Sequence, residues 1–142
     1  MEIRVYRYNE VGALYPAVYA EVFGRPPKPT DHPSFVALGY EAEAPVGFMS
    51  GYAQDDETLY VQRIGLFPDH RSEGLALELW GEAARFLGRD GYRWLAGAVR
   101  SDNPIPLVVA LKAGWRVVGF KQDSRGVGYV LTLLDLQEVA SS

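Results

Sequence analysis

Hydrophobic and polar residues follow two distinct periods along the first two thirds of the chain. Apolar residues recur at about every second position in four segments, which predicts strands at 3–8, 34–40, 46–53 and 58–67. Elsewhere they recur at steps of three and four, which predicts amphipathic helices at 11–23 and 72–87. Both periods in one chain indicate an α/β architecture.

Single residues mark where these elements begin and end. We expect Asn9 to end the first strand and Pro16 to lie in the first turn of the first helix or to kink it. Gly24 is suited to close that helix, and Gly88 and Gly91 to close the second.

The remaining third of the chain continues the alternation of strand and helix. The pattern predicts strands at 92–99, 115–120 and 127–134, and a helix that begins at Pro104, continues over 107–112 and is ended by Gly114. Asn103 and Pro104 occupy the N-cap and first helical positions, where each is favoured. The segment 25–33 holds four prolines in nine residues, so we expect a stiff loop that borders a substrate groove.

Composition and charge narrow the range of functions. With 142 residues, of which 48% are hydrophobic, we expect a single domain spanning 1–142. The net charge of -4 and the scattered basic residues argue against a nucleic-acid partner. No segment approaches the roughly 18 apolar residues of a membrane span, and the N-terminus lacks a signal-peptide core. We therefore expect a cytoplasmic protein with no membrane partner.

The absence of cysteine removes several kinds of chemistry. It excludes disulfides, thiolate metal sites and a cysteine-bound acyl intermediate. The two histidines, His32 and His70, are far apart and lie in no ligand-spaced motif, so we expect no metal.

The junction of the fourth strand and the second helix carries an anion-binding pattern, Arg71-x-x-Gly74-x-Ala76. The first N–H groups of a helix have no intrahelical partner, and the helix dipole favours a negative charge there. Gly74 and Ala76 let phosphate oxygens approach the backbone, and Arg71 can add a charge-assisted bond. The alternative is an ordinary helix start in which the glycine permits close packing on the sheet.

This frame resembles the GNAT superfamily of N-acetyltransferases. Members show a strand ending V-x-P-x-Y-R, a glycine-rich turn into a long helix, and a later N-(x)10-G-F. The corresponding residues here are Leu66-Phe67-Pro68-Asp69-His70-Arg71, then Gly74 and Ala76, then Asn103 with Gly114-Trp115. The resemblance implies the GNAT fold, an α/β fold with a mixed, mostly antiparallel sheet of about six to seven strands and flanking helices.

The resemblance also implies an activity. Such a protein transfers an acetyl group from acetyl-CoA to a primary amine of a small molecule or protein, by direct attack in a ternary complex. The pantetheine arm of CoA would pair with residues 66–68 in a gap between two parallel strands. Asn103 would touch the same arm or serve only as a helix cap, and a homodimer is common in the family. The implied CoA-binding residues are Leu66, Phe67, Pro68, Arg71, Ser72, Glu73, Gly74, Leu75, Ala76 and Asn103.

The candidate catalytic residues match the family pattern less closely than the candidate CoA-binding residues do. The backbone N–H of Leu66 is suited to stabilise the oxyanion, and Glu57 is the nearest carboxylate that could act as a base through water. Alternatively, Glu57 is a solvated turn residue. In the family, a tyrosine seven residues after the motif Asn often protonates the leaving thiolate, but here that position is Ala110. The hydroxyls that could replace this general acid are those of Tyr129, Tyr60 and Ser101.

A second departure affects CoA binding. Glu73 stands where the family commonly has a basic residue, which predicts weaker attraction for the diphosphate. Together with Ala110, it leaves open a non-catalytic acyl-CoA-binding or regulatory module as the alternative function. An unrelated α/β interaction domain is a further alternative.

Overall fold

The computed structural model describes residues 1–140, which fold around one seven-stranded sheet. The strand order is β1-β2-β3-β4-β5-β7-β6, in which β4 and β5 run parallel and all other neighbours run antiparallel. The predicted α/β fold with a mixed, mostly antiparallel sheet is therefore confirmed. The strands are β1 (Glu2–Arg7), β2 (Phe35–Glu41), β3 (Ala44–Ala53), β4 (Thr58–Leu66), β5 (Trp94–Arg100), β6 (Arg116–Gln122) and β7 (Gly128–Asp135).

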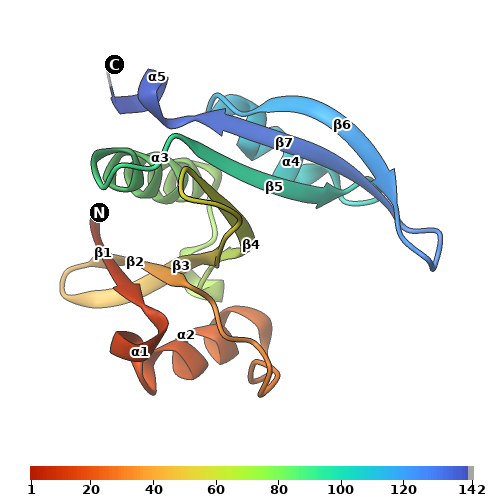
Figure 1. The fold of residues 1–142 in the computed structure, drawn as a ribbon. Coiled ribbons are helices and arrows are strands. Elements are labelled where there is room, and N and C mark those ends of the chain that lie inside the picture. Colours follow the sequence, from red (N-terminus) through yellow and green to blue (C-terminus); the bar gives the residue numbers. More distant parts are fainter. Residues whose placement is uncertain (141–142) are drawn as a thin grey trace.

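Helices cover both faces of this sheet, and each face has its own hydrophobic core. On one face α1 (Tyr8–Val11) and α2 (Leu14–Phe23) pack on alternate residues of β2 and β3, including Val36 and Phe48. On the other face lie α3 (Glu73–Arg89), α4 (Pro104–Lys112) and α5 (Leu136–Ala140), which bury Leu59 and Leu95. Figure 1 shows β1–β3 with α1 and α2 in the lower half, and β5–β7 in the upper half.

Several boundaries differ from the sequence-based expectation. The first strand ends at Arg7, before Asn9, because the Arg7 N–H donates to the Glu10 carboxylate at 3.0 Å and opens α1 at once. The expected helix 11–23 is interrupted at Gly12, whose φ of 57° is accessible to glycine. Pro16 lies in the first turn of α2, as predicted. The helix α3 runs one residue past Gly88 and ends before Gly91.

Two short elements were not predicted at all. A 3-10 turn, η1 (Pro68–His70), joins β4 to the segment before α3. The short helix α5 begins after Asp135, whose carboxylate accepts the Gln137 N–H at 3.0 Å. The same carboxylate receives both arms of the Arg93 guanidinium at 3.1 and 3.2 Å, across 42 residues of sequence.

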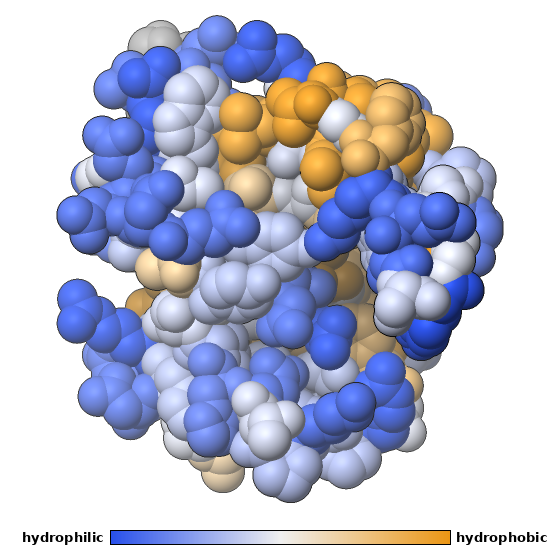
Figure 2. Space-filling view, turned by 45° about the vertical axis from the view of Figure 1, so that its right-hand side comes forward, coloured by the Kyte–Doolittle hydropathy of each residue, from blue (hydrophilic) through white to orange (hydrophobic). Residues whose placement is uncertain are grey.

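Apolar side chains also reach the surface. Figure 2 shows hydrophobic residues gathered in the upper part of one face, and β6 is an edge strand whose outer side is unpaired. The homodimer remains a prediction. No helix within residues 1–140 is long and apolar enough to cross a lipid bilayer. The exposed apolar residues of α4 and β6 include Ile105, Val108, Leu111, Val118 and Phe120.

We expect Asp135→Asn to lower the thermal midpoint at neutral pH. The Arg93 guanidinium holds the pKa of Asp135 below its usual value of 3.8, so its stabilising effect is complete above that value. The effect disappears as the pH falls through the lower pKa of the folded state. Thermal unfolding from pH 7 to 3 should show a difference between the two proteins that shrinks below about pH 4. Asp56→Asn, in an exposed turn, is the control, and a difference independent of pH would contradict the expectation.

Candidate functional site

The site begins where β4 separates from β5. The two strands pair in parallel from Thr58 opposite Trp94 to Val61 opposite Gly97, and the pairing stops there. On its other side β4 continues to pair with β3, but Gly51 lies opposite Val61 and Ser50 opposite Arg63. Gln62 is therefore the extra residue of a β-bulge, which bends a strand and interrupts its ladder. A gap between β4 and β5 opens from this bulge.

Backbone groups of β4 face this gap. The Phe67 N–H donates to the Val46 carbonyl of the β3 side at 2.7 Å. Because alternate residues of a strand point their N–H groups to opposite neighbours, the N–H groups of Leu66 and Ile64 point toward the gap. The Leu66 carbonyl on that side accepts from Arg71 Nε at 3.2 Å.

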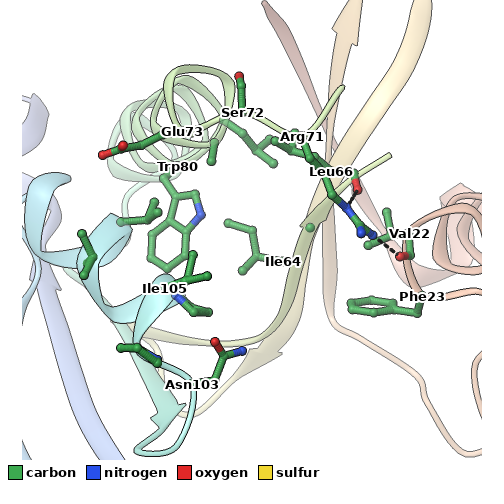
Figure 3. A pocket seen from close by; sticks show the side chains of 17 residues that line it. Val22, Phe23, Ile64, Leu66, Arg71, Ser72, Glu73, Trp80, Asn103 and Ile105 are labelled. Atoms are coloured by element: carbon green, nitrogen blue, oxygen red, sulfur yellow. Dashed lines mark hydrogen bonds between the residues drawn. The ribbon is translucent and has the colours of Figure 1, made fainter. Parts of the chain in front are cut away.

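A cavity of about 750 Å³ lies between the end of β4 and the first turns of α3 and α4. Its wall is mostly apolar, and Trp80 of α3 points into it between Ile64 and Ile105 (Figure 3). Such a cavity with a few polar groups suits a long, thin ligand. Of the residues expected to bind CoA, those that line it are Leu66, Arg71, Ser72, Glu73, Ala76 and Asn103; those outside its lining are Phe67, Pro68, Gly74 and Leu75.

The N-terminus of α3 presents two backbone donors at the edge of this cavity. Ser72 is the N-cap: its hydroxyl accepts the Leu75 N–H at 3.1 Å, and its carbonyl accepts the Ala76 N–H at 3.0 Å. The N–H groups of Glu73 and Gly74 precede the helical ladder and have no partner among the described residues. An anion at the helix start would receive these two bonds and the favourable helix dipole.

Gly74 has no structural reason to be glycine. A Cβ atom built there would meet open space, and Gly74 is not among the glycines with positive φ. The alternative that this glycine serves close packing on the sheet is therefore wrong. The open space above the helix start is available to a ligand.

The side chain of Arg71 is used within the protein. Its Nε donates to the Leu66 carbonyl and its Nη2 to the Val22 carbonyl at 2.7 Å, so it joins the end of β4 to the end of α2 (Figure 3). The sequence suggested a bond from this guanidinium to a bound anion. In the structure Arg71 braces the wall of the cavity through Nε and Nη2, and the bond to an anion stays a prediction.

The charge of Glu73 is compensated by a residue that sequence reasoning missed. The Lys112 ammonium, in the last turn of α4, forms an ion pair with the Glu73 carboxylate. The two residues are 39 positions apart, and no local motif joins them. The ion pair brings a cation to the helix start where the sequence alone shows only an unfavourable carboxylate.

Asn103 is the N-cap residue of α4, but its side chain makes no capping bond. The alternative that Asn103 serves only as a side-chain cap is therefore wrong. Its amide lines the cavity opposite the start of α3 (Figure 3), where it is available to a ligand.

The structure does not bring the other catalytic candidates into this cavity. Glu57 lies in the exposed turn before β4, and the eight steps from Thr58 to Leu66 place it about 26 Å or more from the Leu66 end. The Tyr129 hydroxyl donates to Asp123 at 3.4 Å in the β6–β7 turn. Ala110 is fully buried in the core, and its carbonyl accepts the Trp115 N–H at 3.0 Å.

Two further cavities continue the path beyond the gap. One of about 340 Å³ shares Ile64, Trp80 and Asn103 with the first and extends along β5 to Thr132. The next, of about 370 Å³, shares Gln62 and Arg63 with the second and is bordered by the proline-rich loop. Through these shared lining residues the three cavities adjoin one another in sequence, from the start of α3 to the proline-rich loop. Within residues 1–140 no cluster of His, Cys, Asp and Glu is suited to hold a metal ion.

The middle cavity holds most of the buried polar atoms that lack a hydrogen bond. Among the described residues these are Ser50 Oγ, Arg63 Nε and Trp115 Nε1, and the last two line this cavity. Buried donors without partners are rare in folded proteins and call for an explanation. Here both face the space that β4 opens as it leaves β5.

A sequence profile described as the acetyltransferase (GNAT) family matches residues 7–107. The chain belongs to this family. Its members transfer acetyl groups from acetyl-CoA, so the helix start, the apolar cavity and the strand gap are interpreted together as a site for that substrate. A comparison with curated proteins finds no match.

Solved structures of GNAT enzymes share the fold. The ribosomal-protein-S18-alanine N-acetyltransferase of Escherichia coli is 14% identical, with a TM-score of 0.72 over 95% of this chain and 93% of that one. The aminoglycoside 6'-N-acetyltransferase of Enterococcus faecium is 10% identical, with a TM-score of 0.72 over 96% and 97%. A Bacillus anthracis protein in complex with acetyl coenzyme A is 13% identical, with a TM-score of 0.63 over 75% and 64%.

We expect Gly74→Val to weaken CoA binding by at least about tenfold, because the new side chain occupies the open space above the helix start. The thermal midpoint should stay nearly unchanged, since no protein atom lies within 4 Å of the added Cβ. Calorimetric titration with CoA, with Gly81→Ala in the middle of α3 as the control, measures the effect. Equal affinity of wild type and Gly74→Val would contradict this use of the helix start.

We expect Glu73→Gln to bind CoA about two- to fivefold more tightly at low salt, because Lys112 then faces the diphosphate without a competing carboxylate. Lys112→Gln should bind more weakly by a similar factor. Both differences should shrink at about 1 M salt, where exposed charges are screened. An unchanged affinity of both variants at low salt would show that this ion pair lies outside the reach of the ligand.

Proposed function

We propose that this protein transfers an acetyl group from acetyl-CoA to a primary amine of a small molecule or protein, by direct attack in a ternary complex. The observation that carries the proposal is the continuous path from the unpaired N–H groups of Glu73 and Gly74 to the gap beside Leu66. Membership of the GNAT family supports the same reaction class. The location that we expect for it is the cytoplasm.

Different residues along the path would bind different parts of acetyl-CoA. The N–H groups of Glu73 and Gly74 would hold the diphosphate, assisted by Lys112. The pantetheine arm would follow the apolar wall and bond to the backbone of β4 in place of the missing β5 partner. The Asn103 amide would donate to or accept from the same arm, since it has no bond within the protein.

The chemistry requires one bond to form and one to break. The amine nitrogen attacks the thioester carbonyl, the C–S bond breaks, the amine loses one proton and the thiolate leaves. Without cysteine the chain has no thiol to carry the acyl group, which supports direct transfer. The N–H groups of Ile64 and Leu66, aimed into the gap, would stabilise the developing oxyanion.

Departure of the thiolate can proceed without the tyrosine that is missing at Ala110. A thiol has a pKa near 8.5, so its anion is a good leaving group close to neutral pH. The unpartnered Trp115 Nε1–H faces the middle cavity and would stabilise a nearby negative charge by a hydrogen bond. An indole N–H donates a hydrogen bond without giving up its proton, so solvent would protonate the thiolate.

The deciding experiment is a thiol-release assay with acetyl-CoA and a panel of amines. We expect turnover with at least one amine, and loss of at least about tenfold in kcat/KM in Gly74→Val through a higher KM for acetyl-CoA. CoA binding in calorimetry without turnover on any amine would favour the alternative, a non-catalytic acyl-CoA-binding or regulatory module. The burial of Ala110 away from the cavity is the observation that favours this alternative.

A further inference from the structure

The bulge in β4 determines where Arg63 points. Val61 and Ile64 both pack toward α3 on one face of the sheet, with two residues between them. In an unbroken strand the side chains of Gln62 and Arg63 would point to opposite faces. Because Gln62 is the bulged residue, both side chains line the outer cavity on the α2 face.

Arg63 has no anionic partner among the described residues. Its guanidinium lies 5.9 Å from the centre of the Tyr19 ring, and its Nε is buried without a hydrogen bond. Arg25 lies over the same ring at 5.8 Å and donates to the Tyr19 hydroxyl. Lys28 lines the outer cavity as well. In residues 1–140 none of these three cations forms an ion pair.

The lack of a partner is notable because the protein carries a net charge of -4. Five other arginines are paired with carboxylates, namely Arg4, Arg85, Arg93, Arg100 and Arg125. The carboxylate that borders the outer cavity, Asp31, accepts the Tyr15 hydroxyl at 2.9 Å and does not pair with Arg63. The other titratable neighbour is His32, whose ring packs on Tyr8. The lining of the cavity thus carries two cations, Arg63 and Lys28, and one carboxylate, Asp31, which is 2.9 Å from the Tyr15 hydroxyl.

We propose that the acceptor is a small amine that carries a carboxylate close to its amino group, and that Arg63 binds this carboxylate. This inference rests on the proposed acetyl transfer. A guanidinium matches a carboxylate in a two-bond geometry, and a buried unpaired donor gains most from such a partner. Arg63 also lines the middle cavity, so a carboxylate held there places an adjacent amine at the strand gap.

The position of Arg63 limits how far apart the two groups of the acceptor lie. Arg63 borders both the gap and the outer cavity, whereas Lys28 borders only the outer one. An α-amino acid fits this spacing, with its side chain directed toward the outer cavity of about 370 Å³. A polyamine would meet two cations without an ion-pair partner, Arg63 and Lys28, which disfavours it electrostatically.

The test compares matched acceptors. L-Alanine, L-phenylalanine and L-glutamate are each assayed against their α-carboxamides, with acetyl-CoA saturating. We expect kcat/KM to favour at least one acid over its amide by at least about tenfold, and Arg63→Gln to abolish this preference. The amide has the less basic amine, so any bias from protonation opposes the expected result. Arg63→Lys should restore part of the preference, because lysine has the positive charge but cannot bind a carboxylate in the two-bond geometry of a guanidinium.

Controls separate this role from a structural one. The KM for acetyl-CoA and the thermal midpoint of Arg63→Gln should match wild type, because no protein carboxylate loses a partner. Arg85→Gln on α3 makes the same change in net charge away from the cavity and should leave the preference intact. Equal rates of wild type on acid and amide, or an equal loss on both in Arg63→Gln, would overturn the inference. So would a preference for O-phosphoethanolamine over all the amino acids.

A binding experiment decides the inference even if no amine is acetylated. Saturation-transfer NMR with the same acid and amide pairs, in the presence of CoA, should detect tighter binding of an acid to wild type than to Arg63→Gln. If CoA binds and an acid binds through Arg63 without turnover, the proposed catalysis fails and the anion site stands. If amines are acetylated but no acid is preferred in either assay, the catalysis stands and the anion site fails.

Discussion

The bulge at Gln62 is the constraint on which the site depends. Up to Val61 the strand β4 pairs with both neighbours, and beyond the bulge it follows β3 alone. This leaves backbone N–H groups at Ile64 and Leu66 that no strand satisfies, in the middle of the sheet and not at its edges. The same bend creates space for the apolar cavity and turns Arg63 to the opposite face. One extra residue therefore shapes both halves of the site.

Local periodicity was sufficient to predict most of the fold. The helices α2, α3 and α4 follow from helical spacing and cap residues, and the strands follow from short apolar runs, of which β2 and the middle of β3 are buried on both faces. The bulge left a signal that was not used: two polar residues in succession, Gln62 and Arg63, where strict alternation expects one. The helix α5 has almost no signal in the sequence. Five residues carry no usable period, and its start depends on Asp135, which is held by Arg93 across 42 residues.

The candidate site likewise contains residues with a local sequence signal and residues whose role depends on distant partners. Gly74 and the helix start were found because the reason for them is local: free N–H groups and a missing side chain at one turn. The uses of Arg71 and Glu73 were not found, because their partners come from distant elements. Val22 lies 49 residues from Arg71, and Lys112 lies 39 residues from Glu73. The sequence shows neither the bonds from Arg71 to the carbonyls of Leu66 and Val22 nor the ion pair of Glu73 with Lys112, because α2 and α4 supply the partners.

Apart from the Ser50 hydroxyl, the buried side-chain atoms of the described residues that lack a hydrogen bond lie with other free donors along one route. It begins at the N–H groups of Glu73 and Gly74, passes the Asn103 amide and the Trp115 indole, and ends at Arg63. A folded chain normally satisfies such groups because each buried orphan is destabilising by about 1–3 kcal/mol. Their concentration on a single path, and not across the core, is what a protein selected only for stability would avoid. Substrates that span this path would supply the hydrogen-bond partners that these groups lack within the protein.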